Sequence, residues 1–124
     1  MKILVDEKYF NLEKELEYLE PRIEYERIVD KNVSQIKNSG IGKSYFDFFI
    51  FDLRENINHT SEIINEIKKY NPNIKTIAIT SKKNGRYQGS FFFRGVDLFL
   101  YQETDREFLL SYLKRAHIRL SKSS

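Results

Sequence analysis

The amino-acid sequence predicts one doubly wound α/β domain, in which helices cover both faces of a five-stranded parallel sheet. The first observation behind this prediction is residues 45–53, an almost wholly apolar, aromatic and β-branched run. Such a run is typical of a strand that is buried on both faces. The second is that similar runs alternate with segments of helical spacing, which calls for parallel strands joined by right-handed crossovers. The third is the length of 124 residues, which suits a single hydrophobic core.

The expected strands are short apolar runs bounded by polar or turn residues. They lie at residues 2–5, 23–29, 46–52, 74–79 and 96–101. The second of these runs alternates apolar and charged residues, so we expect it near an edge of the sheet. The sequence Asn-Pro-Asn at residues 71–73 predicts the turn that precedes the fourth strand.

The expected helices show apolar residues at helical spacing or carry signals for the start of a helix. They lie at residues 9–19, 32–37 and 61–70, and from residue 104 to the end of the domain. Thr60 or Ser61 is the expected N-cap of the third helix, and residues 104–107 have the form of a capping box before the last. The apolar stripe of the last helix is expected at Phe108, Leu109, Tyr112, Leu113 and Ala116. Residues 82–94 are ambiguous because two glycines weaken a helix there.

Composition excludes several classes of function. The chain has no cysteine, so disulfides, thiol catalysis and cysteine-ligated metal sites are ruled out. Its net charge of +3 is too small to indicate nucleic-acid binding. The apolar run at the amino terminus is too short for a signal peptide and no stretch has the length of a membrane span, so we expect a cytoplasmic protein. We expect residues 1–120 to form the domain and residues 121–124 to form a tail.

Polar residues follow three of the expected strands at the point where each strand ends. Asp6 and Glu7 follow the first, Asp52 ends the third, and Thr80 and Ser81 follow the fourth. Because the carboxyl ends of the strands meet at one edge of a doubly wound sheet, these groups are expected to converge. Neighbouring carboxylates are tolerated where Mg²⁺ neutralises them, and a metal-backed aspartate can attack a phosphoryl donor. The alternative is that Asp6 and Glu7 only begin the first helix, where acids suit the helix dipole.

Five segments of the chain resemble the receiver domain of bacterial two-component response regulators, in order and nearly without gaps. They are residues 1–7, with the opening strand and acidic pair; residues 46–53, with the phosphoacceptor aspartate; residues 62–68, in the third helix; residues 77–81, with the switch hydroxyl; and residues 95–100, which resemble Gly-Ala-Asp-Asp-Tyr-Leu. The resemblance covers the whole chain and implies the flavodoxin-like receiver fold.

The resemblance also implies roles for individual residues. Asp52 would accept the phosphoryl group, Thr80 would bind it, and Phe99 would be the switch aromatic. Mg²⁺ would be held by Asp6, Glu7 and Asp52. The protein would be a signalling switch rather than an enzyme, and a histidine kinase would phosphorylate it. Receivers often dimerise through the fourth helix, fifth strand and last helix, and they often precede a DNA-binding output domain, which would lie outside this chain.

The chain departs from the receiver pattern at several positions. The usual lysine after the fifth strand is Gln102, which can donate a hydrogen bond but brings no charge to pair with a phosphoryl group. The neighbouring proline is replaced by Glu103, and the proline that usually comes four residues after the aspartate is Asn56. Phe99 lacks the hydroxyl of the usual tyrosine. These departures predict an atypical or degenerate receiver.

Two other interpretations stay open. If the first strand is read without a gap, Glu7 and Lys8 occupy the positions of the acidic pair, and Lys8 would lie in the pocket in place of a metal. The chain would then be a pseudo-receiver, an interaction module that works without phosphorylation. The other interpretation is a phosphohydrolase with Asp52 as nucleophile, although Arg54 occupies the place where such enzymes carry a second acid.

Three further features have simpler interpretations. Residues 91–93 are all phenylalanine, and on the expected fourth helix one of them would face outward and mark a contact surface. The basic residues of the last helix are expected to form a solvated face near its carboxyl end. His59 and His117 are expected at the surface, because neither has the partner spacing of a metal ligand.

Overall fold

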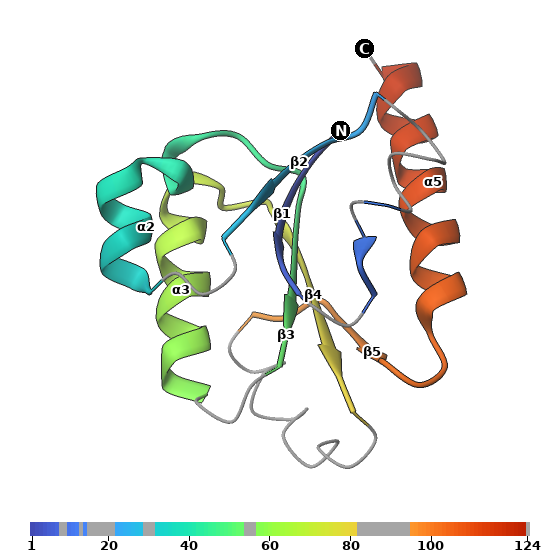
Figure 1. Cartoon of the computed structure of the whole chain (residues 1–124). Helices are drawn as coiled ribbons and strands as arrows, with labels where there is room; N and C mark the ends of the chain where they lie inside the picture. Colours follow the sequence, from blue (N-terminus) through green and yellow to red (C-terminus); the bar gives the residue numbers. More distant parts are fainter. Residues whose placement is uncertain are drawn as a thin grey trace.

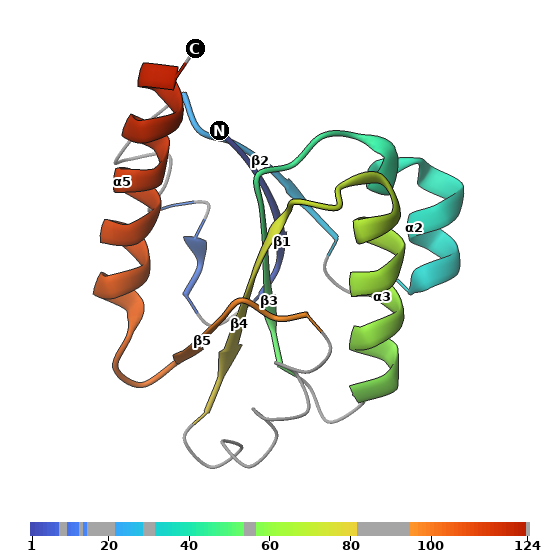
Figure 2. The same ribbon diagram turned by 180° about the vertical axis from the view of Figure 1, so that it is seen from behind.

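The computed structural model describes residues 1–7, 10–12, 14, 22–28, 32–53, 57–81 and 95–123. Five parallel strands form one sheet in the order β2-β1-β3-β4-β5. They are β1 (Lys2–Asp6), β2 (Glu24–Arg27), β3 (Phe48–Asp52), β4 (Lys75–Thr80) and β5 (Leu98–Tyr101). One face of the sheet carries α2 (Val33–Ser39), the 3₁₀ helix η1 (Ile41–Lys43) and α3 (Ile57–Tyr70), and α5 (Arg106–Ser123) covers the other (Figures 1 and 2). The predicted three-layer fold is confirmed.

The strand predictions agree with the structure to within two residues at each end. The second strand, predicted near an edge, pairs with β1 alone and is an edge strand. Most of the helix predicted at residues 9–19 and the whole of the segment at 82–94 fall outside the described residues. Lys8, Asn56 and the three phenylalanines at 91–93 also lie outside them.

The core consists of two clusters, one on each face of the sheet. Alternate residues of β3 point to opposite faces, so Phe48 and Ile50 join the cluster under α5, while Phe49 and Phe51 join the one under α3. All five residues of β3 are buried as a result. The Phe49 and Phe51 rings stack with their centroids 4.9 Å apart. The run at residues 45–53 therefore contains the central strand that its composition predicts.

The helix starts differ from the prediction. α3 begins at Ile57, so Thr60 and Ser61 lie inside the helix and the prediction that one of them is its N-cap is wrong. α5 begins at Arg106, which puts Asp105, rather than Thr104, immediately before the helix. α5 also continues to Ser123 and includes three residues of the predicted tail. No helix in the described part of the chain is long and apolar enough to cross a membrane.

The apolar stripe of α5 is rotated from its predicted position. Phe108 is 53% exposed, whereas Leu110, which the prediction left out, is buried. His117 is only 5% exposed, so its predicted surface position is wrong. The two corrections have one cause, because residues seven apart lie on the same side of a helix and Leu110 and His117 turn inward together.

The turn before β5 is held by hydrogen bonds around Gly95. Gly95 has a φ of +91°, which glycine adopts readily, and a Cβ there would lie 2.7 Å from Lys68 Nζ. Its carbonyl accepts hydrogen bonds from Lys68 Nζ and the Thr76 hydroxyl, each at 2.8 Å. Asp97 Oδ2 accepts one from the Thr76 backbone N–H at 2.8 Å. These contacts set the position of β5 beside β4.

Candidate functional site

Polar side chains from the three strands β3, β4 and β5 meet at the carboxyl edge of the sheet. Asp52 is the last residue of β3, Thr80 is the last residue of β4, and Gln102 directly follows β5. The ladder extends past the strand ends, because the Leu53 N–H donates to the Ile79 carbonyl and the Gln102 N–H donates to the Thr80 carbonyl, both at 2.8 Å. The structure therefore brings these three predicted site residues to one edge, as parallel pairing requires.

The three groups differ in burial and bonding. Asp52 is 6% exposed and Thr80 is 1% exposed, so little of either reaches bulk water. The Thr80 hydroxyl donates a long hydrogen bond, of 3.3 Å, to the Ser81 carbonyl. Gln102 Oε1 is buried and makes no hydrogen bond. By strand alternation Asp52 shares the α5 face with Ile50 and Thr80 shares the α3 face with Ala78, so the two residues share an edge of the sheet but not a face. The Thr80 hydroxyl and the Gln102 amide are hydrogen-bond donors at that edge.

Phe99, the predicted switch aromatic, lies on the same face of the sheet as Thr80. Phe99 pairs with Ala78, two residues before Thr80, so Phe99 and Thr80 are diagonal neighbours across the β4–β5 pair. Phe99 is partly buried and packs against the cluster under α3. Tyr101 lies directly opposite Thr80 on the same face, and Phe99 is its diagonal neighbour on β5.

Glu7 lies beside the edge but its carboxylate is engaged locally. The side chain is fully buried, and its two oxygens accept hydrogen bonds from the backbone N–H groups of Phe10, at 2.8 Å, and Leu12, at 3.1 Å. Leu12 is already helical, so the acid satisfies amides at the start of a helix, where negative charge is favoured. For Glu7 the geometry agrees with the alternative interpretation, an acid that begins the first helix.

Asp6 and Asp52 end neighbouring strands but lie at different levels and on different faces of the sheet. Asp6 pairs with Phe51, so it lies one residue short of the level of Asp52. By strand alternation Asp6 shares the α3 face with Leu4. Asp52 shares the opposite face with Ile50.

The described residues do not show the three carboxylates gathered as the ligand set that the sequence predicts for Mg²⁺. Among the described residues, no group of three or more histidine, aspartate or glutamate side chains could hold a metal ion. A hard cation needs several oxygens at one centre, whereas both Glu7 oxygens already accept hydrogen bonds from backbone N–H groups. The metal role of these residues stays a prediction, and Lys8, the alternative occupant of the pocket, lies outside the described residues.

Asp105, directly before α5, has a structural role that the sequence did not reveal. Asp105 Oδ2 accepts a hydrogen bond from the Tyr101 N–H at 2.7 Å, which ties the start of α5 to the end of β5. An acid directly before an apolar helix is a recognised start signal and could have identified it.

Neither ring nitrogen of the buried His117 makes a hydrogen bond. The side chain of His59 is outside the described part of the chain.

No family model matches the chain, and no curated protein matches it in sequence. Solved structures do share its fold. A CheY-like response regulator receiver domain protein from Methanospirillum hungatei is 18% identical with a TM-score of 0.66, over 99% of this chain and 97% of that chain. A DNA-binding response regulator of the LuxR family from Staphylococcus aureus is 21% identical with a TM-score of 0.64, over 92% and 96% of the two chains.

A third similar structure comes from a different class of protein. It is CpaE, a candidate pilus assembly protein from Burkholderia thailandensis, which is 20% identical with a TM-score of 0.64, over 94% of this chain and 98% of that chain. Identities of this size carry the fold and not the activity. The strand order and these likenesses together show that the chain has the fold of response regulator receiver domains.

Proposed function

We propose that the chain is an atypical receiver, a signalling switch in which Asp52 accepts a phosphoryl group from a histidine kinase. The observation that carries the proposal is the position of Asp52, buried at the end of β3 beside the end of β4, which carries Thr80. A carboxylate oxygen of Asp52 would attack the phosphorus and form an acyl phosphate, while the bond from phosphorus to the donor imidazole breaks. The Thr80 hydroxyl and the Gln102 amide would donate hydrogen bonds to the phosphoryl oxygens.

Receiver domains generally bind Mg²⁺ at the phosphorylation site. Both oxygens of Glu7, one of the predicted ligands, are already hydrogen-bonded, so the transfer is proposed without a metal-dependent step. Gln102 brings no positive charge to this edge, so its side chain would offer the phosphoryl oxygens a neutral donor. We therefore expect Asp52 to be phosphorylated slowly compared with a receiver that has the usual lysine.

The proposal is tested by incubating the chain with acetyl phosphate, and separately with beryllofluoride, at several Mg²⁺ concentrations. Intact-mass spectrometry should detect one phosphoryl group, and amide NMR shifts should appear around Asp52, Thr80 and Phe99. The Asp52→Asn variant should lose both signals, because the amide is not a nucleophile for the transfer. Glu62→Gln, which changes an exposed carboxylate of α3, is the matched control and should behave as the unaltered chain.

The second candidate function is a pseudo-receiver that binds a protein partner without phosphorylation. Two residues favour it. Both Glu7 oxygens accept hydrogen bonds from backbone N–H groups at the start of a helix, and Gln102 has no charge to pair with a phosphoryl group. The likeness to a pilus assembly protein also supports it, because the same fold then occurs outside response regulators. Absence of an adduct and of shifts at millimolar acetyl phosphate or beryllofluoride would remove the first proposal and leave this one.

We further propose that the output of the switch is association through β5 and α5, either with a second copy or with an output domain that binds DNA. Phe108, Ile118 and Leu120 are exposed on α5 and supply apolar surface for such a contact. Phe108 stacks on Tyr112 with ring centroids 6.2 Å apart, which presents a preformed aromatic surface.

Phe108→Glu should weaken self-association by about tenfold or more, because interface aromatics are often binding hot spots and the new carboxylate must be desolvated. Sedimentation velocity over a concentration series, with and without beryllofluoride, measures the effect. Tyr70→Glu alters an aromatic residue of similar exposure on α3 and is the control. Equal dissociation constants for Phe108→Glu and the unaltered chain would exclude this face from the interface.

A further inference from the structure

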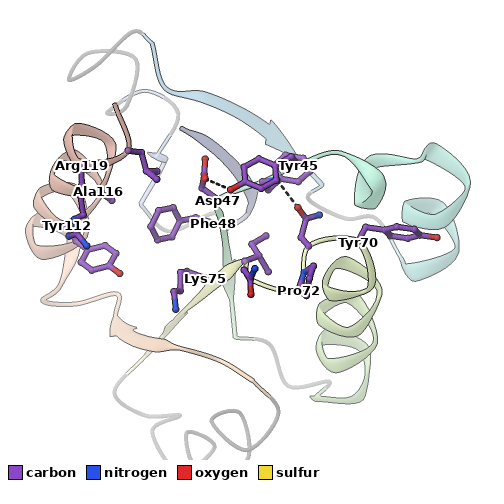
Figure 3. A pocket seen from close by; sticks show the side chains of 14 residues that line it. Tyr45, Asp47, Phe48, Tyr70, Pro72, Lys75, Tyr112, Ala116 and Arg119 are labelled. Carbon is purple, nitrogen blue, oxygen red and sulfur yellow. Dashed lines mark hydrogen bonds between the residues drawn. The ribbon is translucent and has the colours of Figure 1, made fainter. Parts of the chain in front are cut away.

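A cavity of about 330 Å³ lies at the amino edge of the sheet, the edge opposite Asp52. The first residues of β3 and β4, Phe48 and Lys75, line it together with Tyr112, Ala116 and Arg119 of α5. Figure 3 shows these side chains around one opening, with Tyr45 and Asp47 at its rim. The volume is that of a site for a small organic molecule.

The inner wall of the cavity is aromatic. The Phe48 ring is 5% exposed and meets the Tyr112 ring edge-to-face, with centroids 5.9 Å apart and an angle of 80° between the planes. Both rings are held, because Phe48 belongs to the core under α5 and Tyr112 packs against that core. Ala116 lies one helical turn after Tyr112, and its small side chain leaves the space beside the rings open. A flat aromatic group could stack against this wall.

The charges of the cavity favour an anion. Lys75 is exposed and lies next to Phe48 in the β3–β4 register, and Arg119 comes from the opposite side on α5. In Figure 3 the Phe48 ring lies between these two cationic side chains. Asp47 is the one carboxylate among the described lining residues, and two cations around an aromatic wall are well placed to pair with a carboxylate or phosphate.

Asp47 is already hydrogen-bonded at the rim. Its Oδ2 accepts a hydrogen bond from the Lys2 backbone N–H at 2.9 Å, and its Oδ1 accepts one from the Tyr45 hydroxyl at 3.1 Å. The hydrogen bond and the negative charge of Asp47 both raise the pKa of Tyr45, so the phenol stays protonated and keeps donating. The carboxylate is thereby drawn to Lys2 and Tyr45 rather than to a ligand.

We propose that this cavity binds a small aromatic acid, with its ring against Phe48 and Tyr112 and its acidic group between Lys75 and Arg119. A cationic ligand would meet two like charges, and an aliphatic anion would leave the aromatic wall uncovered. The site is separate from the phosphoacceptor edge, so it does not depend on whether Asp52 is phosphorylated. A ligand bound in this cavity would be a second signal, in addition to the phosphorylation proposed at the opposite edge of the sheet.

The test compares two fluorescent probes that share one ring system. Anilinonaphthalene sulfonate is an aromatic anion, and phenylnaphthylamine is its uncharged counterpart. The folded chain should bind the sulfonate about tenfold more tightly, because only the sulfonate pairs with the cations. Lys75→Ala and Arg119→Ala should each remove most of that preference, while binding of the neutral probe stays unchanged. Arg115→Ala, an exposed cation of α5 outside the cavity, is the matched control.

Amide NMR of the whole chain locates the probe. Shifts at Tyr45, Phe48 and Tyr112 that saturate with the sulfonate would support the proposal, and Ala116→Phe should abolish binding of both probes by filling the space. Equal affinity for the two probes, unchanged affinity in Lys75→Ala and Arg119→Ala, or shifts confined to the Asp52 edge would overturn it. Both alanine variants alter exposed side chains, so they decide the question even where Ala116→Phe fails to fold.

Discussion

Glu7→Ala should lower the free energy of unfolding by about 3 kcal/mol. The buried carboxylate accepts two hydrogen bonds from backbone N–H groups, and alanine would leave both amides without an acceptor. Bonds to an ionised group are stronger than neutral ones, and the helix start also loses a favourable negative charge. Urea unfolding followed by circular dichroism measures the loss.

The same experiment separates the two roles that the sequence allows for Glu7. If Glu7 begins a helix, the loss of stability is equal with and without Mg²⁺. If Glu7 is also a metal ligand, the unaltered chain gains stability from Mg²⁺ and Glu7→Ala does not, so the loss is larger with Mg²⁺ than without it. Glu107→Ala, which removes an exposed acid from the first turn of α5, should cost about 0.5 kcal/mol or less and is the control.

Gln102→Lys should speed acyl-phosphate formation from acetyl phosphate, and strengthen beryllofluoride binding, by about tenfold. The Gln102 backbone is anchored by the hydrogen bond from its N–H to the Thr80 carbonyl, so a new side chain starts from the same position. An ammonium group there can pair with phosphoryl oxygens. The substitution also removes a buried amide oxygen that makes no hydrogen bond. Time-resolved intact-mass spectrometry gives the rate.

Thr104→Lys adds the same charge on an exposed residue of the neighbouring turn and should leave the rate unchanged. If Gln102→Lys and Thr104→Lys raise the rate equally, the effect is general electrostatic attraction and not a contact with the phosphoryl group. If neither variant forms an adduct, the failure of Asp52 has another cause, and the pseudo-receiver interpretation gains weight.

The strands and the place of Asp52 could be predicted because both depend on local patterns. A strand that is buried on both faces must be apolar at nearly every position, and β3 is buried throughout. Parallel strands have their carboxyl ends at one edge, so Asp52 and Thr80 had to reach the same edge once the sheet was predicted to be parallel. No knowledge of side-chain contacts was needed for either conclusion.

The helix starts and the face of α5 were predicted less well. The three residues 108–110 are all apolar, and the sequence does not say which two turn inward. Leu110 is buried and Phe108 is exposed because the sheet contacts one particular side of α5, and the same rotation buries His117. The N-cap prediction for α3 failed because the helix begins at Ile57, before Thr60 and Ser61.

The sequence by itself determined the fold class and the position of an acid at the end of a strand that is buried on both faces. It did so because hydrophobic periodicity and strand ends are properties of neighbouring residues. Only the tertiary structure showed how Asp6 and Glu7 are placed, since Asp6 pairs with Phe51, one residue short of Asp52, and the Phe10 and Leu12 amides donate to Glu7. The cavity between Phe48, Lys75 and Arg119 likewise exists only in the folded chain, because it joins residues that are far apart in sequence.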